Sequence, residues 1–264
     1  MSSGIDPKQY WEDRLTRNFN DRGVGDIGLP ESYNRCLYGV RRWVFQRAMR
    51  LAGIRPAEAK VVDIGSGTGF YIRNWVDAGV SDLTGCDITQ VAVDQLSQNY
   101  PGVAFRQADI GDSMNPFPKE SFDCVSSFDV LFHIIDDRRF AAAIQNIAGM
   151  LKQNGVFLYS DNLVCEAFNV KHQVGRTETT ILESLERAGL TVEHRIPMFV
   201  LMNDPVRSRS RLLKKAFSLI YQLASWSSAM GMLVGCGLLP IELLLTRIIR
   251  HGPSTEVLVC RRTR

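Results

Sequence analysis

Apolar and polar residues follow one another in blocks, and these blocks predict strands separated by helices. Short apolar runs rich in β-branched residues predict buried strands at 60–65, 83–88, 103–108, 122–128, 155–160, 191–197 and 255–262. Apolar residues at helical spacing predict helices at 7–22, 31–52, 70–78, 90–99, 137–151 and 177–188. The pair Asn154-Gly155 predicts a tight turn at the end of the fifth of these helices. Strands that alternate with helices in this way are typical of an α/β fold with a parallel, doubly wound sheet.

The segment 61–70, VVDIGSGTGF, places three glycines directly after the first predicted strand. Gly65 and Gly67 allow a sharp turn and the close approach of a ligand, because no Cβ stands in the way. The order D-x-G-x-G-x-G differs from the G-x-G-x-x-G of dinucleotide sites. The carboxylate of Asp63 at the strand end would also repel a phosphate. These features count against a nicotinamide oxidoreductase.

The second and third predicted strands also end in acids. Asp87 lies about 20 residues past the glycine loop, where a βαβ unit places a carboxylate on a ribose diol. Asp109 follows the third strand. Three acids around one glycine loop suit a ligand with an amino acid head, a ribose and an adenine.

This series of motifs resembles the class I S-adenosylmethionine-dependent methyltransferases. The resemblance implies a Rossmann-like sheet of seven strands with an antiparallel last strand, and S-adenosylmethionine as the cofactor. It implies that the glycine loop passes under the methionine part, Asp87 holds the ribose hydroxyls and Asp109 holds the adenine amino group. The expected cofactor contacts are Asp63, Gly65, Gly67, Asp87, Ile88, Asp109, Ile110 and Phe128. We also expect residues of the second helix to reach the methionine carboxylate: Tyr33, Tyr38, Arg41 and Arg42.

Methyl transfer to a hydroxyl requires a positioned nucleophile and gains from a general base. His133 follows the fourth strand, Asp161 ends the fifth, and we expect the two to face each other across one cleft. This arrangement resembles the base pair of small-molecule and sugar O-methyltransferases. His172 is a second candidate base, and packing or a surface position remains the alternative for both histidines. We assign no metal site.

The acceptor is less well defined by the sequence. The net charge of +3 does not indicate nucleic acid, and no Asn/Asp-Pro-Pro-Tyr/Phe motif follows strand four. We expect O-methylation of a bulky small molecule: a secondary metabolite, a glycoside or a lipid-linked intermediate. We expect an apolar, aromatic and methionine-rich acceptor pocket that includes Phe128, Phe132, Tyr159, Phe168, Met198, Phe199 and Met202. The alternatives are an amine acceptor, a lipid or quinone acceptor at a membrane surface, and a non-catalytic protein that binds S-adenosylmethionine.

We divide the chain into a helical cap (1–54), a cofactor-binding core (55–202), a helical insertion (203–253) and a last core strand (254–264). The insertion opens with basic residues and continues almost uncharged. A single membrane span would separate the last strand from its sheet, and two spans need about 40 apolar residues. Residues 206–250 therefore form a lid over the acceptor site, a homodimer face or an amphipathic membrane contact. Six scattered cysteines and a polar N-terminal segment predict a cytoplasmic protein, with a peripheral position at a membrane surface as the alternative.

Overall fold

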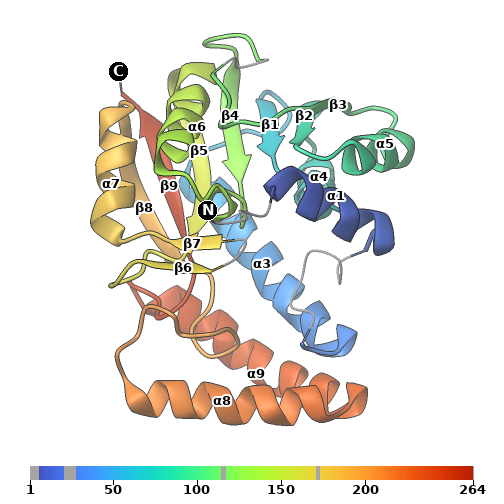
Figure 1. The fold of residues 1–264 in the computed structure, drawn as a ribbon, viewed down its shortest axis with the longest axis vertical. Coiled ribbons are helices and arrows are strands. Elements are labelled where there is room, and N and C mark those ends of the chain that lie inside the picture. Colours follow the sequence, from blue (N-terminus) through green and yellow to red (C-terminus); the bar gives the residue numbers. More distant parts are fainter. Residues whose placement is uncertain (1–5, 21–27, 114–116, 171–172, 264) are drawn as a thin grey trace.

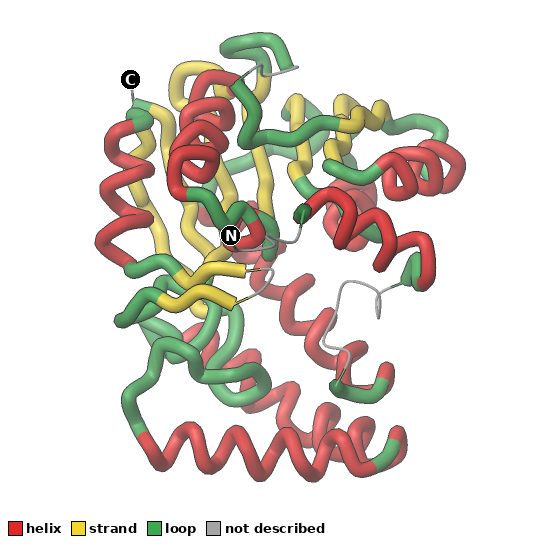
Figure 2. The backbone as a smooth tube through the Cα atoms, viewed as in Figure 1, coloured by secondary structure: helices red, strands yellow, loops and turns green. Residues whose placement is uncertain are grey.

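The computed structural model describes residues 6–20, 28–113, 117–170 and 173–263, and its centre is a sheet of seven strands (Figure 1; Figure 2). The strands of this sheet are β1 (Lys60–Ile64), β2 (Asp82–Asp87), β3 (Ala104–Gln107), β4 (Phe122–Ser127), β5 (Leu151–Asp161), β8 (Leu190–Pro197) and β9 (Glu256–Arg262). Their order is β3-β2-β1-β4-β5-β9-β8, and β9 runs antiparallel to both of its neighbours. The predicted α/β fold with an antiparallel last strand is confirmed. The order reverses between β1 and β4, and doubly wound sheets bind ligands at such a point.

The helices are α1 (Pro7–Arg17), α3 (Glu31–Leu51), α4 (Phe70–Asp77), α5 (Gln90–Asn99), α6 (Asp137–Met150), α7 (Glu178–Arg187), α8 (Arg211–Trp226) and α9 (Ser228–Ile248). Helices α3 to α7 cover the two faces of the sheet, whereas α1 packs on α5, α9 packs mainly on α3, and α8 packs on α9. Neighbouring strand residues point to opposite faces. Val61 therefore packs in an apolar cluster with α3 and α4, whereas Val62 packs in a second cluster with α6 and α7.

Several local predictions were wrong. The first helix ends at Arg17, earlier than expected. Helix α6 stops at Met150, and Leu151 is already extended as the first residue of β5. Asn154 adopts a left-handed φ of 62° inside β5, where the pairing with β4 shifts register. The pair Asn-Gly favours a local turn, and here the turn forms an irregularity in a strand rather than the end of a helix. A short hairpin, β6 (Phe168–Val170) and β7 (Gln173–Gly175), was not predicted.

Helices α8 and α9 form the insertion between β8 and β9, and α9 packs along α3 (Figure 1). A Cβ on Gly235 would lie 2.8 Å from Sγ of Cys36, so the close approach of α9 to α3 requires glycine there. The buried carboxylate of Glu242 accepts hydrogen bonds from the backbone N–H groups of Val200 at 2.7 Å and Leu201 at 2.9 Å. This carboxylate joins the insertion to the chain segment that follows β8.

Replacing Glu242 should destabilise the fold, because buried N–H groups that lose their acceptor carry a desolvation cost. We expect Glu242→Ala to lower the free energy of unfolding by about 2–4 kcal/mol. Glu242→Gln should cost less, since an amide oxygen still accepts. Urea unfolding measures both, with the exposed Glu31→Ala as a control. A loss no larger than that of Glu31→Ala would contradict the assigned role.

Candidate active site

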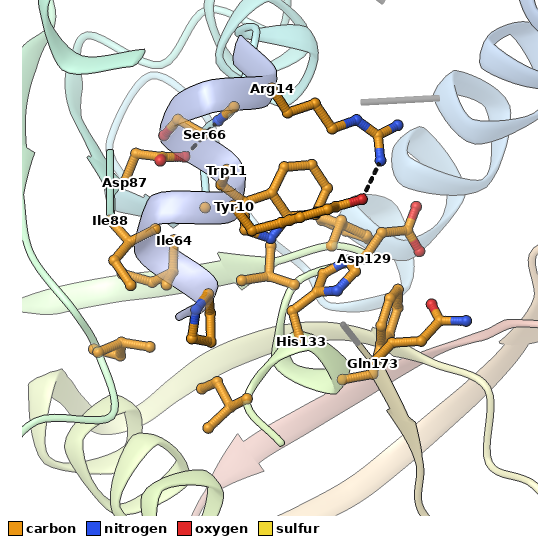
Figure 3. A pocket seen from close by; sticks show the side chains of 18 of the residues that line it. Tyr10, Trp11, Arg14, Ile64, Ser66, Asp87, Ile88, Asp129, His133 and Gln173 are labelled. Atoms are coloured by element: carbon orange, nitrogen blue, oxygen red, sulfur yellow. Dashed lines mark hydrogen bonds between the residues drawn. The ribbon is translucent and has the colours of Figure 1, made fainter. Parts of the chain in front are cut away.

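A cavity of about 890 Å³ lies beyond the carboxyl ends of β1, β2 and β4, between the sheet and helix α1 (Figure 3). Ligand pockets commonly measure about 300–1,000 Å³, so this cavity is large enough for a cofactor and a small acceptor together. Its walls come from the glycine loop, helices α1 and α3, the short 3₁₀ helix η1 (Leu131–His133) and the segments that follow β5 and β8. Residues distant in the sequence therefore meet at one edge of the sheet.

The glycine loop and Asp87 form one hydrogen-bonded unit. Gly65 and Gly67 have φ angles of 76° and 52°, in the region that favours glycine. Asp87 Oδ2 accepts the backbone N–H of Gly67 at 2.8 Å, and its Oδ1 accepts the N–H of Thr89 at 2.9 Å. Burial raises the pKa of Asp87, while these N–H groups act in the opposite direction. The carboxylate both shapes the loop and lines the cavity.

Asp63 is buried outside the cavity lining, unlike the other predicted cofactor contacts. Its Oδ1 accepts a hydrogen bond from Ser126 Oγ at 2.6 Å, and its backbone oxygen accepts one from Ser66 Oγ. Burial raises the pKa of Asp63 to about 7. The structure therefore places this acid as a support of the glycine loop, because β4 supplies a hydroxyl that holds it inside the sheet.

The side of the cavity near β2 and β3 contains the predicted adenine and ribose contacts. Ile88, Asp109 and Ile110 all line the cavity. Asp109 also forms an ion pair with Arg139, with 2.5 Å between Oδ2 and Nη2. Arg139 lines the cavity too. It was not predicted, because it lies in an ordinary amphipathic helix and no motif marks it. Phe128 lines the cavity as well and stacks on Tyr71.

Helix α1 closes one side of the cavity and is fastened to the start of α5. Tyr10, Trp11 and Arg14 of α1 line the cavity (Figure 3). The carboxylate of Glu12 accepts the backbone N–H groups of Gln90 at 2.9 Å and Val91 at 3.0 Å. A negative charge at a helix N-terminus is favourable, so α1 gains a fixed position over the loop and Asp87.

Arg41 of α3 reaches the carboxyl end of β4. Its guanidinium pairs with Asp129, with 2.7 Å between Nη2 and Oδ2. Asp129 has a left-handed φ of 59° and donates its N–H to Ser160 Oγ at 2.7 Å. The hydroxyl of Tyr71 is buried and has no hydrogen-bond partner among the described residues. These groups offer a ligand both a cation and a free hydroxyl.

The other residues expected to meet the methionine carboxylate divide into two groups. Tyr38 lines the cavity beside Arg41. Tyr33 is buried away from it and donates its hydroxyl to the backbone oxygen of Met202. Arg42 is exposed and lies outside the lining. Only one face of α3 points toward the cavity. Tyr38 and Arg41 lie on that face, whereas Tyr33 and Arg42 point in other directions.

The predicted pairing of His133 with Asp161 is wrong. His133 lines the cavity, and its ring meets the Trp11 ring edge-on with 4.8 Å between centroids. Asp161 is buried outside the lining, where it accepts hydrogen bonds from the Tyr159 hydroxyl and the Asn162 backbone N–H. Tyr159 and Asp161 are two residues apart in a strand, so their side chains lie on the same face of the sheet. Because Tyr159 is in the core, Asp161 points into the core as well. Burial raises the pKa of Asp161 to about 6. His172 lies outside the described residues.

On the β5 and β9 side of the sheet, away from Asp87, the cavity lining includes polar residues that the predicted aromatic and methionine-rich pocket did not contain, and we call this part of the lining the polar end. The lining residues that sequence reasoning missed there are Asn162, Gln173, Asn203, Asp204 and Thr255. Phe132 does line the cavity, but Tyr159, Met198, Phe199 and Met202 belong to the core. The polar residues lie after β5, after β8, in β7 and before β9. They could not be predicted because the sequence around each of them looks like that of an ordinary loop.

Known proteins resemble this chain in the segment that contains the glycine loop and in the overall fold. Residues 62–159 match the family model described as "Methyltransferase domain". This match spans the glycine loop, Asp87 and Asp109, and over that segment it supports the resemblance to the class I S-adenosylmethionine-dependent methyltransferases. The predicted cofactor, S-adenosylmethionine, is confirmed by the family match, and the residues of the cavity fit it. Asp87 ends β2, Asp109 follows β3, and the buried hydroxyls of Thr68 and Tyr71 lack partners among the described residues.

Named relatives of the methyltransferase domain have diverse acceptors. "EEF1A lysine methyltransferase 2" of Danio rerio is 25% identical over 59% of this chain and 68% of its own length. An "mRNA cap guanine-N(7) methyltransferase" of Caenorhabditis elegans is 26% identical over 51% of this chain and 41% of its own length. The structure of "magnesium protoporphyrin IX methyltransferase (ChlM)" from Synechocystis, with bound SAM, covers 99% of this chain and 100% of its own, with a TM-score of 0.57 and 15% identity. At that identity the likeness shows the fold alone.

Removing the Asp87 carboxylate should weaken cofactor binding, because charge-assisted hydrogen bonds contribute about 1.5–3 kcal/mol each. We expect Asp87→Ala to weaken S-adenosylhomocysteine binding by about 10- to 100-fold in calorimetric titration. Asp82→Ala is a matched control, because Asp82 begins the same strand and forms an exposed pair with Lys60. Equal affinities for the two variants would contradict the role of Asp87.

Loosening helix α1 should shorten the lifetime of the bound cofactor. We expect Glu12→Ala to speed S-adenosylhomocysteine dissociation by about five- to thirtyfold in stopped-flow measurements, because two backbone N–H groups lose a charged acceptor. The neighbouring Asp13→Ala is the control, since Asp13 is exposed and accepts a hydrogen bond from Gln9. If the two variants dissociate at the same rate, α1 does not hold the cofactor in place.

Proposed function

We propose that this methyltransferase domain methylates a hydroxyl group of a small polar organic molecule, with His133 as the general base. The observation that carries the proposal is the position of His133 in the cavity wall. Figure 3 draws it beside Asp129 and Gln173, across the cavity from Asp87 and Ile88. A base at this position lies between the end that suits the cofactor and the polar end that suits an acceptor.

Residues of this chain would hold the cofactor at one end of the cavity. Asp87 would accept the ribose hydroxyls and Asp109 the adenine amino group, with Ile88 and Ile110 against the adenine. Arg41 would meet the methionine carboxylate. When bound, S-adenosylmethionine supplies an electrophilic methyl carbon. The protein has to position the nucleophile and keep water away from it, and helix α1 supports both tasks.

The polar end favours an acceptor with several hydroxyl or amide groups, such as a glycoside. Side-chain amides of Asn162, Gln173 and Asn203 line it. Thr255 Oγ1 donates to Asn162 Oδ1 at 3.0 Å, which fixes the orientation of that amide. Convergent groups that both donate and accept hydrogen bonds recognise polar ligands by orientation. These polar groups line the same cavity as Phe128 and Phe132 of the expected apolar pocket.

In this proposal His133 takes the proton of the acceptor hydroxyl as the oxygen attacks. An imidazole can do so near neutral pH. Since Asp161 lies in the core, the ring needs another support. The edge of Trp11 packs against it, and Phe132 packs against the same ring with 4.6 Å between centroids. These two ring contacts would help to orient the base.

Methylation of an amine is a second candidate function. It is favoured by the similarity to the Danio rerio lysine methyltransferase and by two acids in the cavity lining, Asp129 and Asp204. Carboxylates attract a cationic amine. Burial raises the pKa of Asp204, with Lys214 acting in the opposite direction. Amine acceptors also need less help from a base, so this candidate depends less on His133.

Methyl transfer from isotope-labelled S-adenosylmethionine into a cell extract separates the two candidates. The extract is divided into molecules below about 3 kDa and macromolecules, and chemical analysis then identifies the methylated atom. Label on an oxygen of a small molecule would support the proposal. Label on protein lysines would favour the second candidate and contradict the first.

With the small acceptor in hand, His133→Ala should lower kcat by about 10²- to 10⁴-fold, the usual contribution of a general base. The affinity for S-adenosylhomocysteine should stay within a few-fold of the unmodified protein. His194→Ala is the control, because His194 lies in β8 outside the cavity lining. Undiminished turnover of His133→Ala would place the base elsewhere.

A further inference from the structure

Helix α9 has apolar side chains on the side that faces the protein and also on the side that faces outward. Val234, Leu238, Leu239 and Leu243 pack against the core. Further large apolar side chains face outward, with Leu233 67% and Ile248 65% exposed. A helix in water normally buries its apolar stripe, so this pattern indicates an apolar environment outside α9.

Helix α8 repeats the pattern and adds amphipathic character. Leu212, Leu219 and Trp226 are seven residues apart, so they share one side of the helix, and Leu212 is 81% exposed. A different side, with Ile220, Tyr221 and Ala224, packs on the core. The outward stripe of α8 is therefore additional to the contacts that hold the helix in place. Figure 1 shows α8 and α9 together at one end of the molecule.

The charges around these stripes have one sign. Residues 205–250 contain seven basic side chains and a single acid, Glu242, which is buried. Arg211 and Lys215 are exposed next to the stripe of α8 and form no ion pair with the described residues. Basic groups beside an apolar stripe complement an anionic membrane surface, where negatively charged headgroups lie above an apolar interior.

Helix α9 is long and apolar enough to cross a membrane, by length and composition. Its contacts oppose a crossing. Glu242 is tied to the backbone at Val200 and Leu201, and β9 returns directly to the sheet between β5 and β8. A helix held in this way can lie along a bilayer surface while the sheet stays intact.

We propose that the α8–α9 surface docks on anionic phospholipid bilayers. This surface consists of Leu212, Leu219, Trp226, Leu233, Leu244 and Ile248 together with Arg211 and Lys215. A second copy of the chain suits it less well, because a twofold interface would place the same basic residues of both copies near each other. Docking would also bring the cavity close to lipid, since Val206 lines the cavity and α8 begins at Arg211.

Vesicle flotation of the whole chain tests the proposal. Vesicles of phosphatidylcholine with phosphatidylserine are compared with vesicles of phosphatidylcholine alone, at physiological salt. We expect binding to the anionic vesicles and at least tenfold weaker binding to the neutral ones. Arg211→Glu/Lys215→Glu should weaken binding by at least about thirtyfold, because each basic group lost near the surface costs about a factor of five and the new carboxylates are repelled by the anionic lipid. Leu219→Ser/Trp226→Ser should abolish it.

Two controls keep the result interpretable. Lys119→Glu/Arg187→Glu makes the same charge change at exposed residues outside the insertion and should bind vesicles normally. S-adenosylhomocysteine titration shows that each variant is folded. Arg207 is not a suitable target, because it is largely buried between Glu178 and Glu256. Absence of vesicle binding, or binding that survives both surface variants, would overturn the proposal. A dimer that Leu219→Ser/Trp226→Ser dissociates, without vesicle binding, would identify a second copy as the occupant and overturn it as well.

Discussion

The hydrogen bond between the Asp87 carboxylate and the Gly67 N–H is the interaction on which the site depends. It ties the end of β2 to the loop that leaves β1, so two strands and the start of α4 hold one fixed geometry. Gly65 can take its left-handed conformation there, and a Cβ at this position would overlap the Val130 side chain. Because the same carboxylate lines the cavity, shaping the loop and meeting the ligand are properties of one residue.

Around this unit the cavity is assembled from parts that are far apart in the sequence. Helix α1 is held over one end by Glu12, and its Trp11 reaches η1 to touch His133. Helix α3 brings Arg41 to Asp129, and the segments after β5 and β8 bring amides to the other end. The insertion contributes Asn203, Asp204 and Val206 at its start, while α8 and α9 lie outside the lining.

Periodicity predicted the order of strands and helices well, because burial on two faces of a sheet leaves a strong pattern in short apolar runs. The glycine loop and the strand-end acids could also be predicted, because a few neighbouring residues determine the conformation of that loop and the position of each acid at the end of its strand. Two features were beyond this reasoning. The direction of Asp161 depends on the pleat of β5 and on Tyr159, and the polar end of the cavity depends on long-range packing. Residues such as Gln173 and Asn203 carry no local signal that sets them apart from other loop residues.

The most direct test of this account is a calorimetric titration of the whole chain with S-adenosylhomocysteine, with NADH as the comparison. We expect one site per chain with micromolar or tighter affinity for S-adenosylhomocysteine and no binding of NADH. The glycine loop shaped by Asp87 suits the former, and the carboxylates in the cavity lining would repel the pyrophosphate of the latter. Binding of NADH, or no binding of S-adenosylhomocysteine by the folded protein, would contradict it.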